Sequence, residues 1–197
     1  MRFFSFILSN LLFLSAFSYL MLPMALLSQE QVPFQLPSPS ELKRIKTAIL
    51  QTSRGRIEFE LYPEKAPWHV ANFKYLADRN FYNGIRFHIH QAGKIIQGGT
   101  PNPKNPDAGP GYSLPPEFND IPHDRGSLGM ARWPDLLNPY RSSHGSQFHI
   151  LLTHASKMDG SYTVFGKIID GFEVADSLRK GDMIVDLTVY LRPTVNR

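Results

Sequence analysis

The chain has 197 residues, of which 42% are hydrophobic and 19% charged, and this is the composition of one globular domain with a sizeable core. Lys and Arg (21) outnumber Asp and Glu (17), but the charge is scattered along the chain and does not indicate a nucleic-acid-binding protein. Cysteine is absent, which excludes disulfides, thiol catalysis, thiolate zinc sites and iron–sulfur clusters. Sixteen prolines and fourteen glycines favour many turns over a helix bundle.

The first 28 residues differ from the rest of the chain. Only Arg2 is charged, and residues 3–27 form a mostly apolar run of 25 residues. A positive start followed by an apolar stretch is typical of a secretory signal peptide, and the Ala-Phe-Ser sequence at 16–18 offers small residues for cleavage. The run is also long enough to cross a bilayer as an uncleaved anchor. We therefore predict a signal peptide or an N-terminal membrane anchor over residues 1–28, and export to the periplasm, the cell envelope or another secretory compartment.

The composition changes abruptly after this segment. Residues 29–40 hold three prolines and no periodic pattern of hydrophobic residues, which is typical of a linker. We predict a linker over residues 29–44 and a single folded domain over residues 45–197.

A hairpin and a helix open the folded domain. Residues 46–52 and 56–61 are strand-like, and Gly55 between them supplies the positive φ of a tight turn. Apolar and polar residues alternate over 56–61, which predicts a strand with one buried face. Pro67 suits the first position of a helix over 67–78, where apolar side chains recur every three or four residues.

Short strands make up most of the remaining chain. We expect strands at 85–91, 95–98, 127–131, 147–152, 162–169 and 182–191. Residues 100–126 hold seven prolines and little periodicity, which predicts a long ordered loop, and residues 172–180 have the pattern of a second helix. Because turns rather than helices separate the strands, this order favours an antiparallel barrel or sandwich over a parallel α/β fold.

The histidines leave a metal site open as one interpretation. His88 and His90 would share one face of a strand, and His144 and His149 offer two further imidazoles, which zinc accepts as ligands. The sequence has neither an HExxH motif nor a G-x-S-x-G motif, and no lysine-bearing helix follows its paired glycines. A metal-dependent interaction protein is therefore an alternative, whereas a serine hydrolase and a phosphate-binding loop are disfavoured.

Five separated motifs follow one another along the chain. They are Phe87-His88 with Gln97-Gly98-Gly99, Gly109-Pro110-Gly111-Tyr112, RGSLGMA at 125–131, GSQF at 145–148 and DGSYTVFGK at 159–167. In these motifs and their order, from about Thr47 to Val189, the chain resembles the cyclophilin family of peptidyl-prolyl cis-trans isomerases. The resemblance implies a mainly β fold, a closed eight-stranded antiparallel barrel capped by two helices. It also implies an enzyme that needs no cofactor and acts on proline-containing polypeptides.

The resemblance extends to the positions expected to carry catalysis. The glutamines of the family's Q-G-G and S-Q-F phrases are present as Gln97 and Gln147, which we expect to hold the peptide backbone. The family's arginine, which donates a hydrogen bond near the twisted amide, directly follows Phe-His, and here that position is Ile89. Arg132 flanks a segment that can fold over the cleft and is the candidate for a replacement donor.

The resemblance also locates the proline pocket, at Lys94, Ile95, His149, Met158 and Tyr162, which we expect to contact the substrate. Met158 keeps the apolar character of its position, whereas Lys94 and His149 change the chemistry of theirs. The family has phenylalanine at the position of Lys94 and an aromatic residue at that of His149. Lysine and histidine therefore place polar groups where apolar surface is normally buried, which is unfavourable without hydrogen-bond partners.

These observations predict a peptidyl-prolyl cis-trans isomerase that assists the folding of exported proteins, with activity reduced by Ile89. Losing one such donor costs roughly 10²–10³ in rate, whereas enzymes accelerate reactions by at least about 10⁶. A proline-peptide binding module or chaperone with little or no turnover is the alternative. We expect a monomer without metal, cofactor or nucleic-acid partner, attached to a membrane through residues 3–27 if these form an anchor.

Overall fold

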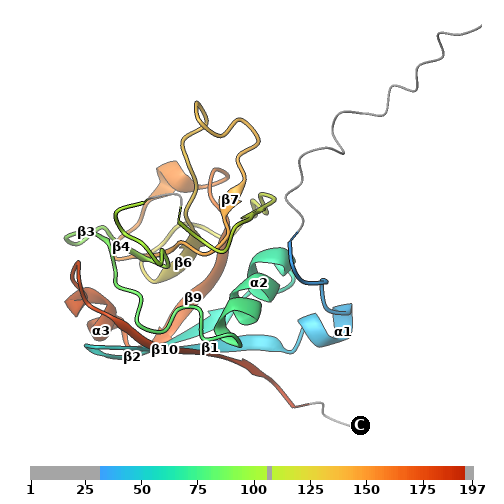
Figure 1. Ribbon diagram of the computed structural model, residues 1–197, viewed down its shortest axis with the longest axis horizontal. Coiled ribbons are helices and arrows are strands. Elements are labelled where there is room, and N and C mark those ends of the chain that lie inside the picture. Colours follow the sequence, from blue (N-terminus) through green and yellow to red (C-terminus); the bar gives the residue numbers. More distant parts are fainter. Residues whose placement is uncertain (1–31, 106–107, 194–197) are drawn as a thin grey trace, which may run out of the picture. The chain divides into compact units, whose positions relative to one another are not determined.

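The computed structural model describes residues 32–105 and 108–193 (Figure 1). These residues belong to one compact unit, which includes most of the predicted linker. The predicted signal peptide or anchor lies outside the described residues. Within the two described ranges, no helix has the length and apolar composition needed to cross a membrane.

The described helices are few and short. They are α1 (Pro39–Leu42), α2 (Pro67–Ala77), the 3-10 helix η2 (Ser156–Met158) and α3 (Phe172–Ser177). The strands are β1 (Ile45–Thr52), β2 (Gly55–Leu61), β3 (Ile89–Gln91), β4 (Ile95–Gly98), β5 (Ser113–Leu114), β6 (Ser127–Met130), β7 (Ser143–His144), β8 (Phe148–Leu151), β9 (Val164–Asp170) and β10 (Ile184–Leu191). The fold is therefore mainly β, as the sequence predicts.

Eight strands form one curled antiparallel sheet in the order β10-β1-β2-β9-β6-β8-β4-β3, and β5 pairs with β7 (Figure 1). Strand β3 forms no ladder with the other edge strand, β10. Instead, the residues before β3 contact the start of β10, through an isolated bridge between Arg86 and Met183 and backbone hydrogen bonds from Gly84 to Ile184 and from Ile184 to Ile85. The sheet is thus a half-barrel, and the prediction of a closed barrel needs correction. The physical reason is that the segment before β3 supplies the hydrogen bonds to the start of β10, and β3 begins only after it, at Ile89, and pairs with β4.

The apolar core lies on the inner side of the curled sheet. Helix α2 contributes Phe73 to an aromatic cluster in which its ring centroid lies 5.5 Å from that of Tyr82, 5.6 Å from Phe148 and 5.2 Å from Phe165. All four rings are fully buried. Because fully burying one large apolar side chain stabilises the fold by about 1.5–3 kcal/mol, this cluster fixes α2 on the sheet.

The start of α2 is capped by a residue far away in sequence. Ala66 at the N-cap makes no side-chain cap, and Pro67 opens the helix as predicted. The Glu117 carboxylate accepts hydrogen bonds from the backbone amides of Trp68 and His69, each at 3.0 Å, and contacts His69 Nδ1 at 2.6 Å. A carboxylate satisfies the exposed amides and the positive end of the helix dipole. This contact also orders the long loop that carries Glu117.

Residues 32–44 are structured, unlike a free linker. The Phe34 ring centroid lies 6.0 Å from that of Trp68, 5.1 Å from Tyr75 and 6.5 Å from Tyr112. Ser38 and Glu41 form a capping box at the start of α1. The proline-rich composition gave no sign of this, because the aromatic surface that receives Phe34 exists only once α2 has folded.

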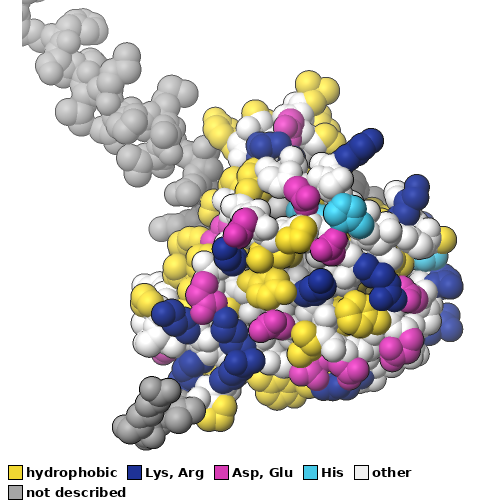
Figure 2. Space-filling view, turned by 180° about the vertical axis from the view of Figure 1, so that it is seen from behind, with side chains coloured by type: hydrophobic (Ala, Val, Ile, Leu, Met, Phe, Trp, Pro, Cys, Tyr) yellow, Lys and Arg dark blue, Asp and Glu magenta, His cyan; other side chains and the backbone are white. Residues whose placement is uncertain are grey.

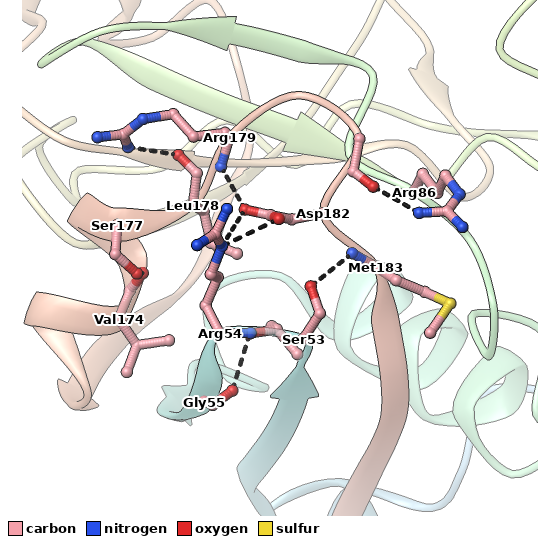
Figure 3. A network of polar contacts seen from close by, with 12 residues as sticks. Ser53, Arg54, Gly55, Arg86, Val174, Ser177, Leu178, Arg179, Asp182 and Met183 are labelled. Carbon is pink, nitrogen blue, oxygen red and sulfur yellow. Dashed lines mark hydrogen bonds and ion pairs between the residues drawn. The ribbon is translucent and has the colours of Figure 1, made fainter.

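A polar network fixes the backbone that enters β3 (Figure 3). Asp182 accepts from Arg54 Nε at 2.9 Å and from the Arg179 amide at 2.7 Å. Burial raises the pKa of Asp182, but these donors outweigh it and hold that pKa below its ordinary value. The Phe87 amide donates to the Asp182 carbonyl at 2.9 Å, and Arg86 Nη1 donates to the carbonyl of the residue before Asp182 at 2.7 Å. These bonds hold residues that were predicted as strand, and β3 therefore begins only at Ile89.

Candidate active site

Cross-strand pairing places four residues in one row across the sheet. Ile89 pairs with Gln97, Gln97 with His149, and His149 with Gly129. Residues directly opposite each other in neighbouring strands share a face. The neighbour of Gln97, Ile96, belongs to the core, so these four residues lie on the outer face. We call Ile89, Gln97, His149 and Gly129 the outer row.

The two predicted glutamines meet beside this row. Gln97 Nε2 donates to Gln147 Oε1 at 3.0 Å. The backbone amide of Gln147 in turn donates to His144 Nδ1 at 3.0 Å. An amide side chain carries both donors and an acceptor, so this pair can hold the N–H and C=O groups of an extended peptide.

Sequence reasoning missed a third member of this cluster. His88 Nε2 lies 3.5 Å from Gln97 Nε2, although strand alternation from Ile89 would turn His88 to the opposite face. Alternation does not hold here because β3 begins only at Ile89. Burial lowers the pKa of His88, Lys180 adds to this effect, and a hydrogen bond with Gln147 opposes it. The imidazole is therefore neutral at neutral pH. Phe87-His88 was recognised as a motif, but nothing in the sequence showed the orientation of the ring.

Ile89 gives the row an apolar side chain where the family pattern has arginine. Its side chain lies opposite Gln97 on the edge strand and is 37% exposed. The nearest preceding arginine, Arg86, is committed to the backbone beside Asp182. Position 89 therefore supplies apolar contact and no hydrogen-bond donor.

Arg132, the predicted replacement donor, is held by other groups. Its side chain is only 4% exposed. Nε donates to the Ser161 carbonyl at 2.7 Å, and Nη1 donates to the Asp135 carboxylate at 2.6 Å and to the Trp133 carbonyl at 3.0 Å. The guanidinium carbon also lies 4.7 Å from the centre of the Tyr162 ring. With Nε and Nη1 already donating, Arg132 fastens the protein's own segments together, which disfavours its use as a donor to substrate.

His149 is a buried neutral ring. It is 1% exposed, and its ring centroid lies 6.1 Å from that of Tyr162. A Cβ at Gly129 would lie 2.4 Å from His149 Nε2, so the ring needs glycine at that position. Burial, with His123 nearby, lowers the pKa of His149 to about 3. Nε2 has no hydrogen-bond partner among the described residues. The predicted pocket wall is thus covered in this structure.

The other predicted pocket residues lie around the outer row. Lys94 is exposed in the turn between β3 and β4, whereas Ile95 is half-buried on the same face as Gln97. Met158 ends η2, and its carbonyl accepts from the Tyr162 amide at 3.1 Å. Among the residues predicted to contact the substrate, Lys94 is therefore the most exposed to solvent.

The histidines of the metal interpretation have separate surroundings. Within the two described ranges, no three side chains of His, Asp or Glu are grouped so that they could hold a metal ion. His144 Nδ1 accepts two backbone amides, those of Ser146 at 3.1 Å and Gln147 at 3.0 Å. His88 lies with the glutamines and His149 lies against Tyr162. His144, His88 and His149 therefore each make a structural contact of their own.

Comparisons with known proteins agree with this fold. Residues 47–194 match the family model described as cyclophilin type peptidyl-prolyl cis-trans isomerase/CLD. The chain is 40% identical over 148 residues to peptidyl-prolyl cis-trans isomerase B of Bacillus subtilis, covering 74% of this chain and 99% of that protein. It is 39% identical over 144 residues to a peptidyl-prolyl cis-trans isomerase of Synechococcus elongatus, covering 72% and 94%.

A solved structure is similar as well. The crystal structure of a Cryptosporidium parvum cyclophilin type peptidyl-prolyl cis-trans isomerase has a TM-score of 0.65 and 28% sequence identity, covering 75% of this chain and 99% of that one. The half-barrel is thus a fold found in peptidyl-prolyl cis-trans isomerases. This chain belongs to the cyclophilin-type peptidyl-prolyl cis-trans isomerase family.

Proposed function

We propose that this protein, as a monomer, isomerises Xaa–Pro bonds in exported polypeptides, more slowly than an isomerase with arginine at the position of Ile89. Family membership supports the reaction, and the apolar run over residues 3–27 supports export. The observation that carries the reduced rate is the pairing of Ile89 with Gln97, because it leaves an apolar group beside the glutamine pair.

The reaction breaks no covalent bond. It must overcome the resonance of the amide, a barrier of about 18–20 kcal/mol, and the catalyst must stabilise the twisted amide more than the planar one. Gln97 and Gln147 would orient the peptide backbone, and Ile89 and Ile95 would contact the proline ring. The protein then excludes water on the apolar side of the bond and holds the backbone on the polar side.

The missing guanidinium sets the expected rate. Removing one preorganised donor costs roughly 10²–10³ in rate, which leaves a measurable part of an acceleration of about 10⁶ or more. His88 stands beside Gln97 with a neutral ring, and a neutral donor supplies less stabilisation than a charged one. We therefore expect slow turnover that still exceeds the uncatalysed rate.

The test is turnover of a proline-containing tetrapeptide by the full chain. Wild type is expected to exceed the spontaneous rate, and Gln97→Ala to lose about tenfold or more, in line with the loss of one preorganised donor. Gln51→Ala is the matched control, because Gln51 is a partly buried strand glutamine that pairs with Arg56 and Asp186. Equal rates for wild type and Gln97→Ala would contradict the proposal.

The same experiment decides the alternative of a proline-peptide binding module. Ile89 in the outer row and the committed Arg132 favour that alternative, since neither offers a free charged donor. Binding of the tetrapeptide by calorimetry, without turnover above background, would establish it. Export is tested separately with a reporter fused after Gln29, and retention of the reporter in the cytosol would refute it.

A further inference from the structure

The loop between β6 and β7 presents large apolar side chains to solvent. Leu136 is 93% exposed, Tyr140 77%, Leu137 68% and Trp133 40%. We call residues 133–140 the apolar loop. It projects from the sheet in gold in Figure 1, and hydrophobic side chains gather at the corresponding tip in Figure 2. Grouped exposed apolar side chains of this kind mark interaction sites more often than scattered ones do.

Polar contacts hold the loop in this exposed arrangement. Asp135 accepts from Arg132 Nη1 at 2.6 Å and from Arg141 Nε at 3.3 Å. Asn138 Nδ2 donates to the Ser142 carbonyl at 2.8 Å, and the Ser142 amide returns a bond to Asn138 Oδ1 at 3.1 Å. The loop therefore has a frame of its own, and its leucines are exposed without being part of an unstructured segment.

The apolar loop is continuous with the active site. The Ala131 amide donates to the Gln147 carbonyl at 2.8 Å, and the His144 amide donates to the Ala131 carbonyl at 2.8 Å, so both ends of the loop meet beside Gln147. Arg132 then links the base of the loop to Tyr162, whose ring packs against His149 of the outer row. A polypeptide held by Gln147 would therefore have the loop beside it.

We propose that the apolar loop is a second binding surface for the unfolded polypeptide substrate, which takes apolar side chains flanking the proline held in the active site. The inference rests on the proposed function and specifies its substrate class as unfolded protein with apolar residues near proline. Continuity with Gln147 favours this occupant.

The test compares a short and a long substrate on the full chain. The loop variant is Leu136→Ser/Leu137→Ser/Tyr140→Ser, and the control variant is Ile169→Ser/Val185→Ser/Tyr190→Ser, which removes exposed apolar residues elsewhere. We expect the loop variant to keep wild-type turnover of the tetrapeptide, because Gln97 and Gln147, which would hold the tetrapeptide, are unchanged in it. Its kcat/KM for proline-limited refolding of an unfolded protein should fall at least fivefold, and the control variant should match wild type on both substrates.

Each other outcome has a defined meaning. Equal kcat/KM of wild type and loop variant on the protein substrate overturns the inference and leaves the proposed function standing. If wild type turns over neither substrate, the proposed function fails, and the loop is judged by anisotropy with a labelled, permanently unfolded polypeptide. A fivefold weaker affinity of the loop variant then supports the loop as a binding surface, and equal affinities overturn it.

Two further occupants of the apolar loop, a lipid surface and a second copy of the chain, are tested by direct measurement. Vesicles of phosphatidylcholine and phosphatidylglycerol are titrated with wild type and loop variant, and the mass of each protein is measured in solution. Loop-dependent vesicle binding, or a loop-dependent dimer, with no effect on the protein substrate would overturn the inference in favour of lipid or of a second copy.

Discussion

The two faces of strands β4 and β8 carry residues of opposite character. Ile96, Phe148 and Ile150 point inward and are fully buried among other apolar side chains. Gln97 and His149, each one position away from a buried residue, belong to the outer row. Gln97 donates a hydrogen bond to Gln147, and His149 Nε2 has no hydrogen-bond partner among the described residues. The inner face therefore supplies stability, whereas the outer face carries the groups that we propose for binding. The outer face itself has two parts, because the Gln97 side chain is partly exposed to solvent whereas His149 is buried.

The largest expected effect concerns the inner face. Phe148→Ala should destabilise the protein by about 3–5 kcal/mol, because it removes a ring that contacts Phe73 and Tyr82 and leaves a cavity. Gln97→Ala, one strand away on the outer face, should cost about 1 kcal/mol or less, the value of one hydrogen bond. Urea unfolding of both variants measures the difference, and similar losses would break the distinction between the faces.

His149, in the buried part of the outer face, should make the stability of the protein depend on pH. The pKa of His149 is about 3 in the folded protein, below its ordinary value of 6.5, so the unfolded chain binds more protons between these values. Stability from this group is complete above pH 6.5 and is lost as the pH falls toward 3, by up to about 1.4 kcal/mol per pH unit. Hydrogen bonds from the backbone and ring of His123 also lower the pKa of Asp159, so wild type is compared with His149→Phe at each pH. A constant difference between the two would contradict the prediction.

The accessible part of the outer face should determine the rate. Ile89→Arg places a guanidinium opposite Gln97 and should raise kcat/KM on the tetrapeptide at least about tenfold, which requires about 1.4 kcal/mol of transition-state stabilisation. Ile89→Leu is the control and should leave the rate unchanged. Background turnover in Ile89→Arg, together with undetectable peptide binding, would mean that Lys94 and His149 have abolished the proline pocket.

The smallest effect is expected at His88. Its contact with Gln97 is long, at 3.5 Å, and a neutral hydrogen bond contributes about 0.5–1.5 kcal/mol, so His88→Ala should lower tetrapeptide turnover about twofold. His90→Ala, on the same edge strand, serves as the control. A loss of a hundredfold in His88→Ala would instead identify the imidazole as a principal donor.

Much of the fold could be predicted because local patterns determine local elements. Gly55, the first residue of β2, has a φ of 140° at the turn from β1, and Pro67 opens α2; the sequence predicts both the positive φ and the helix start. The motifs that led to the family also located Gln97 and Gln147, which the structure joins at 3.0 Å. Turn residues, apolar periodicity and short motifs act over a few residues, and so they are visible in a single sequence.

The remaining features depend on contacts between residues far apart in the chain. Bonds between the segment before β3 and residues 181–184 take the place of the first part of the predicted strand. Strand β3 therefore begins only at Ile89, and His88 turns toward Gln97. Arg132 became unsuitable as a donor through its bond to the Ser161 carbonyl, 29 residues away. The sequence by itself thus determined most of the longer strands and helices, the family and the two glutamines. Only the tertiary structure decided which polar groups remain available beside them, because a donor's availability depends on which distant acceptors the folded chain brings to it.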